Sequence, residues 1–207
     1  MEDELRREMV EYCKLLYDRR LTVSSDGNLS TKVGGGQILI TSDACCFGTI
    51  EECHIVKIDF LGNVLQGDAP PSSEFRMHVE AYKRRKDVQA VVHTHSPYAA
   101  AFAAIDGELE PILSELAIFG GRIPKTGYAP PHTEELAHAI SKLVENHDAI
   151  LLRNHGALAM GGSIREAFLT AERLEFVAQV AAIARQMGGL RKLSREQLAR
   201  LDAILKA

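Results

Sequence analysis

Two histidines stand one residue apart at the end of an apolar run, in the stretch VVHTH (residues 91–95). Alternate residues of a β-strand point to the same side, so His93 and His95 would share one face. A single strand histidine is usually a hydrogen-bonded core or rim residue, but two imidazoles in register both need polar partners. A transition metal such as zinc satisfies both at once. The pair therefore predicts two ligands of a metal site.

A third ligand should come from another part of the chain, also where an element ends. His155 follows the apolar run at 149–153 and precedes Gly156, which would let the backbone turn sharply. Three neutral imidazoles leave a bound metal dicationic and one coordination position open for substrate, as in catalytic sites. The sequence therefore predicts a catalytic metal site made of His93, His95 and His155.

A carboxylate that could work beside this metal is Glu74, at the start of a helix expected after a Pro-Pro pair. Ser72 and Ser73 are candidate N-caps, and an acidic residue suits the positive first turn, so Glu74 also has a purely structural interpretation. Its helix leads directly into the strand with the histidine pair. A carboxylate near a Lewis-acidic metal can move the proton next to a carbonyl, and we therefore predict Glu74 as the acid/base.

The other histidines favour structural roles, because they stand on polar faces or near turns: His54, His78, His132, His138 and His147. His78 is the nearest competitor for the site, because it lies one helical turn from Glu74. The sequence assigns no role to His78.

The elements that would position these residues mix helices and strands without a strict βαβ rhythm. Helical spacing and capping residues predict helices over 3–19, 72–86, 98–105, 133–146, 163–187 and from 194 onward. Alternation and turn residues predict strands over 29–33, 37–41, 54–60, 63–66, 87–94 and 149–153. The early hairpins imply antiparallel pairing. We expect an α/β or α+β sheet with helices on its faces, in one domain spanning 1–207.

The composition argues against several classes of function. A net charge of −4 leaves no electrostatic footprint for nucleic acid. No apolar run reaches the ~18 residues of a transmembrane helix, and the acidic start MEDELRREMV is not a signal peptide. The cysteines lack the spacing of a disulfide framework or a CxxC zinc site, and they are Cys13, Cys45, Cys46 and Cys53. A cytoplasmic setting is expected.

Several segments together resemble the class II aldolase/adducin family: GNLS (27–30), PSSEFRMHVEAY (71–82), VVHTHSPYAAAF (91–102), GGRIPKTGYAPPHTEELA (120–137) and LLRNHGALAMG (151–161). The resemblance covers nearly the whole chain in the correct order. It implies a three-layer α/β/α sandwich with a mixed, largely antiparallel central sheet. It also implies a homotetramer with active sites between subunits.

By this resemblance the metal is Zn²⁺, with Mn²⁺ or Co²⁺ as alternatives, and its ligands are His93, His95 and His155. Glu74 matches a glutamate that can ligate the metal at rest and acts as base when substrate displaces it. Residues that match a substrate-phosphate site are Gly27, Asn28, Ser72 and Ser73. Glu at position 74 favours carbon–carbon cleavage, because the family's epimerases carry Asp there, although its dehydratases also carry Glu.

Three features depart from the aldolase pattern. The phosphate loop, usually like T-P-T-G, here reads Thr41-Ser42-Asp43-Ala44, and Asp43 would repel a phosphate dianion at close range. A tyrosine expected near position 114 is replaced by Ser114 and Glu115. The C-terminal tyrosine of the aldolases has no counterpart, because the last tyrosine is Tyr128. Glu115 or Tyr128 of a neighbouring subunit are candidates for the missing acid.

We predict a zinc-dependent lyase that cleaves a small ketose, such as the ketose 1-phosphate L-fuculose 1-phosphate, through a metal-stabilised enediolate with Glu74 as acid/base. A family decarboxylase, dehydratase or epimerase acting on a related sugar phosphate or keto acid is the enzymatic alternative. A non-catalytic adducin-like interaction module is the alternative from another class.

Overall fold

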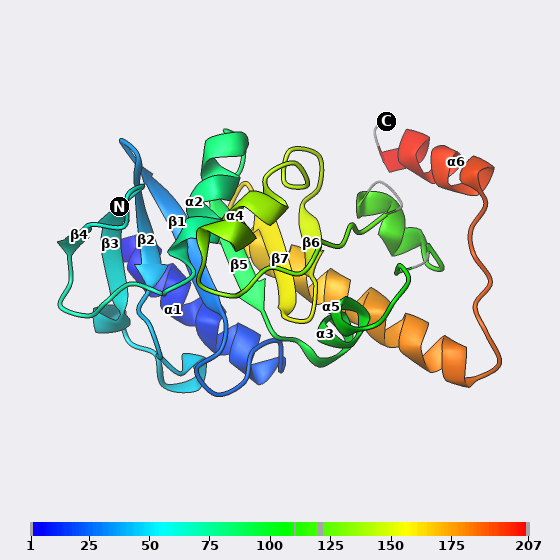
Figure 1. The fold of residues 1–207 in the computed structure, drawn as a ribbon, viewed down its shortest axis with the longest axis horizontal. Coiled ribbons are helices and arrows are strands. Elements are labelled where there is room, and N and C mark those ends of the chain that lie inside the picture. Colours follow the sequence, from blue (N-terminus) through cyan, green and yellow to red (C-terminus); the bar gives the residue numbers. More distant parts are fainter. Residues whose placement is uncertain (1, 110, 120–121, 206–207) are drawn as a thin grey trace.

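The computed structural model describes residues 2–109, 111–119 and 122–205. The strands of these residues form one seven-stranded sheet (Figure 1). The strand order is β4-β3-β2-β1-β5-β7-β6, and each neighbouring pair is antiparallel. The strands are β1 (Asn28–Gly34), β2 (Gln37–Thr41), β3 (Ile55–Asp59), β4 (Val64–Gln66), β5 (Ala90–Thr94), β6 (Ala149–Leu152) and β7 (Gly156–Gly161). An isolated parallel bridge joins Lys125 to Leu151 beside β6.

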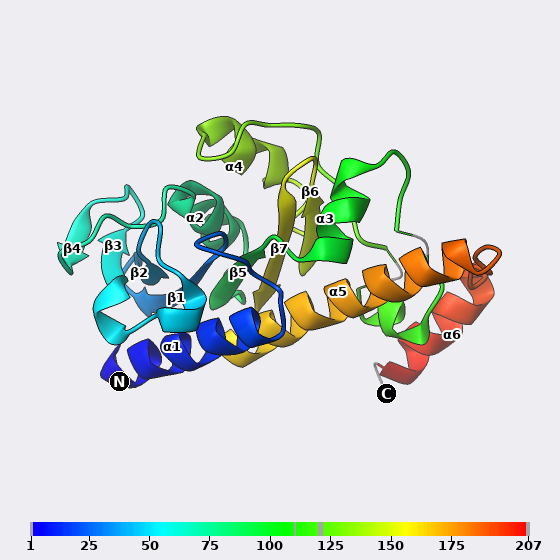
Figure 2. The ribbon, with the colours of Figure 1, turned by 90° about the horizontal axis from the view of Figure 1, so that it is seen from below.

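Helices cover both faces of this sheet, as Figure 2 shows. The helices are α1 (Glu2–Asp18), α2 (Phe75–Arg84), α3 (Pro97–Ala104), α4 (Glu134–Ile140), α5 (Ile164–Gln186) and α6 (Arg195–Leu205). α2 and α4 share one core with the sheet, and α1 and the first half of α5 share the core on the opposite face. α3 packs with α5 beside β6. The expected three-layer α/β/α sandwich is confirmed.

The pleat of the strands divides their apolar residues between these two cores. Ile38 and Ile40 of β2 face α2 and α4, whereas Leu39 between them faces α1. In β5, Val91 faces the α2 side and Val92 faces the α5 side. Because alternate strand residues point to opposite faces, a strand buried on both sides is apolar throughout, as β5 is up to its histidine.

Most of the predicted elements are present, with two differences. β7 was not predicted, because GALAMG is rich in small residues that favour a strand only when neighbours cover them. α4 ends at Ile140 rather than near residue 146, and turns follow it. The caps at Thr133 and Ser163 are as expected, since each hydroxyl accepts the backbone N–H three residues on.

The strand register brings together residues that are far apart in the chain. Asn28 of β1 lies directly opposite His93 of β5, and His93 lies opposite Leu158 of β7. Directly opposed residues of antiparallel strands share a face of the sheet, so Asn28 and His93 both face α2. The fold therefore gathers polar side chains at one end of the sheet, under the start of α2.

Candidate metal centre

The side chains predicted as the metal site come together at the end of β5. Glu74 stands at the start of α2, His93 lies within β5, His95 follows Thr94 at its end, and His155 lies between β6 and β7. His93 Nε2 is 2.9 Å from His95 Nε2 and 3.1 Å from Glu74 Oε2. His155 Nε2 is 3.4 Å from Glu74 Oε1. The ligand atoms of these residues all lie within 4.8 Å of one another, and we call the four residues the metal group.

The turn that presents His155 depends on Asn154 and Gly156. Asn154 has a φ of 56°, in the left-handed region that asparagine tolerates better than most residues. A Cβ on Gly156 would lie 2.3 Å from the carbonyl oxygen of Thr94 and 3.2 Å from the His93 ring. Gly156 is the first residue of β7 and is not among the glycines with positive φ, so the expectation that it makes the sharp turn is wrong. Glycine is needed there because β5 approaches too closely for a side chain.

Glu74 is itself the N-cap residue of α2, and its carboxylate makes no capping bond to the helix. The expectation that Ser72 or Ser73 caps this helix is therefore wrong, although Ser72 Oγ accepts a 3.3 Å bond from the backbone N–H of Glu74. The Glu74 side chain is 6% exposed and turns towards the histidines. The start of α2 thus delivers a buried carboxylate to the metal group.

A buried hydrogen-bond chain holds the Glu74 carboxylate from behind. Asn28 Nδ2 donates to Glu74 Oε2 at 3.1 Å, and His78 Nε2 bonds to Asn28 Oδ1. Because the Asn28 oxygen can only accept, His78 carries its proton on Nε2 and receives the Ser30 hydroxyl at Nδ1, 2.7 Å away. The Tyr82 hydroxyl lies 2.7 Å from Ser30 Oγ and completes the chain.

His78 had no assigned role from the sequence, and in the structure it is fully buried and orients Asn28 behind the site. Its place between Met77 and Val79, one turn after Glu74, was the signal available in the sequence. Burial, with the charge of His93 adding to it, lowers the pKa of His78 to about 3, so the ring is neutral.

Burial and mutual charge set the protonation of the metal group. Burial, together with the charge of His93, lowers the pKa values of His95 and His155 to about 4 each. Burial would raise the pKa of Glu74, but the charge and hydrogen bond of His93 outweigh burial and hold that pKa below its ordinary value. At neutral pH the group therefore offers an ionised carboxylate and the lone pairs of neutral His95 and His155. Burial would lower the pKa of His93, but the charge of Glu74 outweighs it and raises that pKa, so a bound cation would replace a proton on His93.

A divalent cation fits this set of donors. Zinc bound tetrahedrally at about 2.1 Å holds its ligand atoms roughly 3.4 Å apart. The measured separations of 2.9, 3.1 and 3.4 Å lie close to that spacing. His93 Nδ1 bonds to the Ala157 carbonyl at 2.9 Å, which leaves the lone pair on Nε2. Glu74 Oε1 is buried without a hydrogen-bond partner, so a cation would satisfy it.

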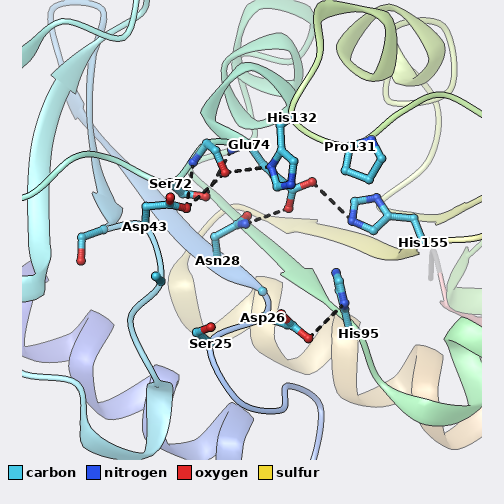
Figure 3. Close-up of a pocket in the computed structure, with 14 residues that line it drawn as sticks. Ser25, Asp26, Asn28, Asp43, Ser72, Glu74, His95, Pro131, His132 and His155 are labelled. Carbon is cyan, nitrogen blue, oxygen red and sulfur yellow. Dashed lines mark hydrogen bonds and ion pairs between the residues drawn. The ribbon is translucent and has the colours of Figure 1, made fainter.

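The metal group opens into a cavity of about 280 Å³ (Figure 3). Asp43, Ser73 and His132 line another part of it, and we call these three residues the Asp43 wall. Ser73 Oγ donates to Asp43 Oδ1 at 3.1 Å and lies 2.8 Å from His132 Nδ1. In Figure 3, Asp43 and His155 lie on opposite sides of Glu74. A substrate in this cavity would therefore touch both regions.

The residues predicted for substrate phosphate all line this cavity, namely Gly27, Asn28, Ser72 and Ser73. Sequence reasoning did not select His132, which lies far along the chain and reaches the cavity through tertiary packing. It also did not select Asp26, whose Oδ2 is 3.8 Å from His95 Nδ1. Glu115 and Tyr128 are exposed and are not among the lining residues, so their role across a subunit boundary stays a prediction.

The fold and the site define a three-layer α/β protein with a histidine–carboxylate metal group at one end of its sheet. The family model described as Class II Aldolase and Adducin N-terminal domain matches residues 7–182. The chain belongs to this family.

Relatives with names and structures agree with this assignment. An L-fuculose phosphate aldolase of Methanococcus maripaludis (strain C5) is 40% identical over 86% of this chain and 96% of its own length. A solved L-fuculose 1-phosphate aldolase superposes with a TM-score of 0.92 at 32% identity, covering 99% of this chain and 97% of that one. A 3-oxo-tetronate 4-phosphate decarboxylase of Escherichia coli O6:H1 (strain CFT073) is 30% identical over 88% of each chain. The prediction of a lyase-type enzyme is confirmed.

Proposed function

We propose that the protein is a zinc-dependent aldolase that cleaves a small ketose, with the carbon skeleton of L-fuculose as the first candidate. The observation that carries this proposal is Glu74 Oε1, a buried carboxylate oxygen without a hydrogen-bond partner among three histidines. The names of the relatives support aldol cleavage, and L-fuculose 1-phosphate is the substrate in those names. The proposed metal ligands are His93, His95, His155 and Glu74.

The proposed cleavage needs a group that handles a proton at carbon. When the bond between C3 and C4 of the ketose breaks, its electrons remain on the ketone fragment as an enediolate. A bound divalent cation supplies electrostatic stabilisation of the negative charge at the ketone oxygen. Glu74 is ionised at rest, so it must first receive the proton that the C4 hydroxyl loses as the aldehyde forms, and it then gives this proton to the fragment's carbon. In the synthetic direction it removes the proton from that carbon. Asn28 fixes the carboxylate by its bond to Oε2. Oε1, which would ligate a cation at rest, would be free to act on the proton once substrate takes the place of Glu74 on that cation.

A decarboxylase is the second candidate, and the specific support for it is the relative named 3-oxo-tetronate 4-phosphate decarboxylase. Loss of CO₂ from a 3-oxo acid that carries a hydroxyl on C2 leaves the same kind of enediolate. Glu74 would protonate it in the same way. The two reactions therefore share the metal group and differ in the bond that breaks.

The test is an assay of purified protein loaded with zinc, manganese or cobalt. Aldol cleavage of L-fuculose 1-phosphate would release dihydroxyacetone phosphate, which a coupled reduction by NADH detects. Decarboxylation of 3-oxo-tetronate 4-phosphate would release CO₂. We expect the protein to cleave the ketose and to bind divalent metal in a stoichiometric amount. Protein that binds no stoichiometric divalent metal would refute the enzyme and favour a non-catalytic module.

We propose a homotetramer with active sites between subunits, one domain over residues 1–207, and a cytoplasmic setting. Exposed apolar side chains on and after α5 support subunit contacts, since Phe176 is 49% exposed and Met187 is 83% exposed. The cytoplasmic setting is supported by the cysteines, which are free thiols as expected in a reducing compartment: Cys13, Cys45, Cys46 and Cys53. Within the described residues, no helix has the length and apolarity needed to cross a membrane. Light scattering after size-exclusion chromatography measures the oligomeric state.

A further inference from the structure

The Asp43 wall already contains an anion bound to the nearest donors. Asp43 Oδ1 accepts the Ser73 hydroxyl at 3.1 Å and the Ser73 backbone N–H at 3.4 Å. A serine hydroxyl has a single proton, and here Asp43 receives it. Ser73 Oγ can therefore only accept from His132 Nδ1, 2.8 Å away. His132, Ser73 and Asp43 thus form a chain of donors that ends on the carboxylate.

Four backbone donors around this part of the cavity are also engaged within the protein. The amides of Ser42, Asp43 and Ser72 donate to the carbonyls of His54, Pro70 and Thr41, at 2.7, 3.0 and 3.0 Å. The amide of Glu74 donates to Ser72 Oγ at 3.3 Å. An anionic ligand group needs several unengaged N–H or O–H donors. These amides cannot supply them without breaking bonds that hold the loop.

The charges of the cavity also disfavour an anionic ligand group. Carboxylates line it at Asp26, Asp43 and Glu74, and no lysine or arginine is among its described lining residues. Asp43 Oδ2 accepts no hydrogen bond from the described residues, because both bonds from Ser73 end on Oδ1. A phosphate dianion beside Asp43 would be repelled, whereas a neutral hydroxyl could donate to Oδ2.

We infer that Asp43 is a specificity residue that accepts a hydroxyl group of the substrate, so that the enzyme prefers an unphosphorylated ketose to the corresponding ketose phosphate. The inference rests on the proposed aldolase function and narrows its substrate class. Glu74, with its buried Oε1, lies in the same cavity, so a ketose held at Asp43 can also reach the metal group.

The experiment compares kcat/KM for L-fuculose and L-fuculose 1-phosphate in zinc-loaded protein. We expect the wild type to favour L-fuculose by about tenfold or more. Asp43→Thr, which replaces the carboxylate by a hydroxyl donor, should move the ratio at least about tenfold towards the phosphate. Asp43→Asn removes the charge with little change of shape and should move the ratio in the same direction. Asp68→Asn, which neutralises an exposed carboxylate outside the cavity, is the matched control and should leave the ratio unchanged.

A wild type that favours the phosphorylated sugar would overturn the inference while supporting the aldolase function. A ratio that neither Asp43 variant moves would also overturn it. If the wild type cleaves neither sugar, the aldolase proposal fails, and titration calorimetry with inorganic phosphate then decides the role of Asp43. Weaker phosphate binding to the wild type than to Asp43→Thr supports that role, and equal or tighter binding to the wild type refutes it.

Discussion

The metal group and the Asp43 wall face the same cavity but are held in very different ways. His93 is fully buried in a central strand, and Glu74 is fixed by a hydrogen-bond chain that runs into the core. Asp43 and His132, in contrast, are exposed loop residues that reach each other through Ser73. The part of the site that would bind metal is thus tied to the stability of the fold. The part that would select the substrate can change at little cost to the fold.

Glu74→Gln should have the largest effect, because it removes the only carboxylate of the metal group while it preserves shape. A lost general acid/base reduces turnover by about 10³-fold. Circular dichroism should show an unchanged fold, and stopped-assay kinetics should show the loss of kcat. Retained turnover would place the acid/base elsewhere in the cavity.

His155→Ala should reduce metal content and activity together, because one proposed ligand is lost. Loss of an outer partner of a metal ligand already costs about 10- to 100-fold in affinity, and loss of the ligand should cost more. Mass spectrometry of the bound metal, with activity at increasing zinc, measures both effects. Unchanged metal occupancy would remove His155 from the ligand set.

His78→Gln should reduce kcat by about tenfold with a smaller change in KM, because Asn28 loses the partner that orients it towards Glu74. His138→Gln, on the exposed face of α4, is the matched control and should behave like the wild type. Equal kcat values in the two variants would show that the buried chain supports the fold without positioning Glu74.

Acid should destabilise the metal-free protein partly through His78. Its pKa is about 3 in the folded state, below the ordinary value of 6.5, so the unfolded chain takes up a proton first as the pH falls. The stability from neutral His78 is complete above about pH 6.5 and declines towards pH 3. Urea denaturation at pH 7.5 and 5.0 should show a larger loss for the wild type than for His78→Gln. Equal losses would contradict a neutral, buried His78.

Ser73→Ala should have the smallest effect on the molecule. Because Ser73 bonds to two exposed side chains, the free energy of unfolding should change by no more than about 0.5 kcal/mol. Metal content should equal that of the wild type, and the effect should appear in substrate selectivity. A loss of metal would show that the two regions depend on each other.

The sequence was sufficient for features that have a local signal. The hairpins, the capped helices and the spacing of His93 and His95 follow from periodicity and turn chemistry. The contacts of His78 and His132 could not be predicted in this way, because each depends on packing between elements far apart in the chain. The prediction that Ser72 or Ser73 caps α2 failed for a related reason. Ser72 and Ser73 have the local propensity of caps, but both line the cavity instead, where tertiary contacts decide their roles.

The pairing of Asn28 with His93 means that the metal group also reports on folding. A slip of one residue between β1 and β5 would turn one of these side chains to the opposite face of the sheet. Such a molecule could keep much of its secondary structure and yet lose the support behind Glu74. The fraction of chains that bind metal tightly therefore measures the fraction in which β1 and β5 have paired in the correct register. The rate of metal uptake during refolding would measure how fast this pairing forms.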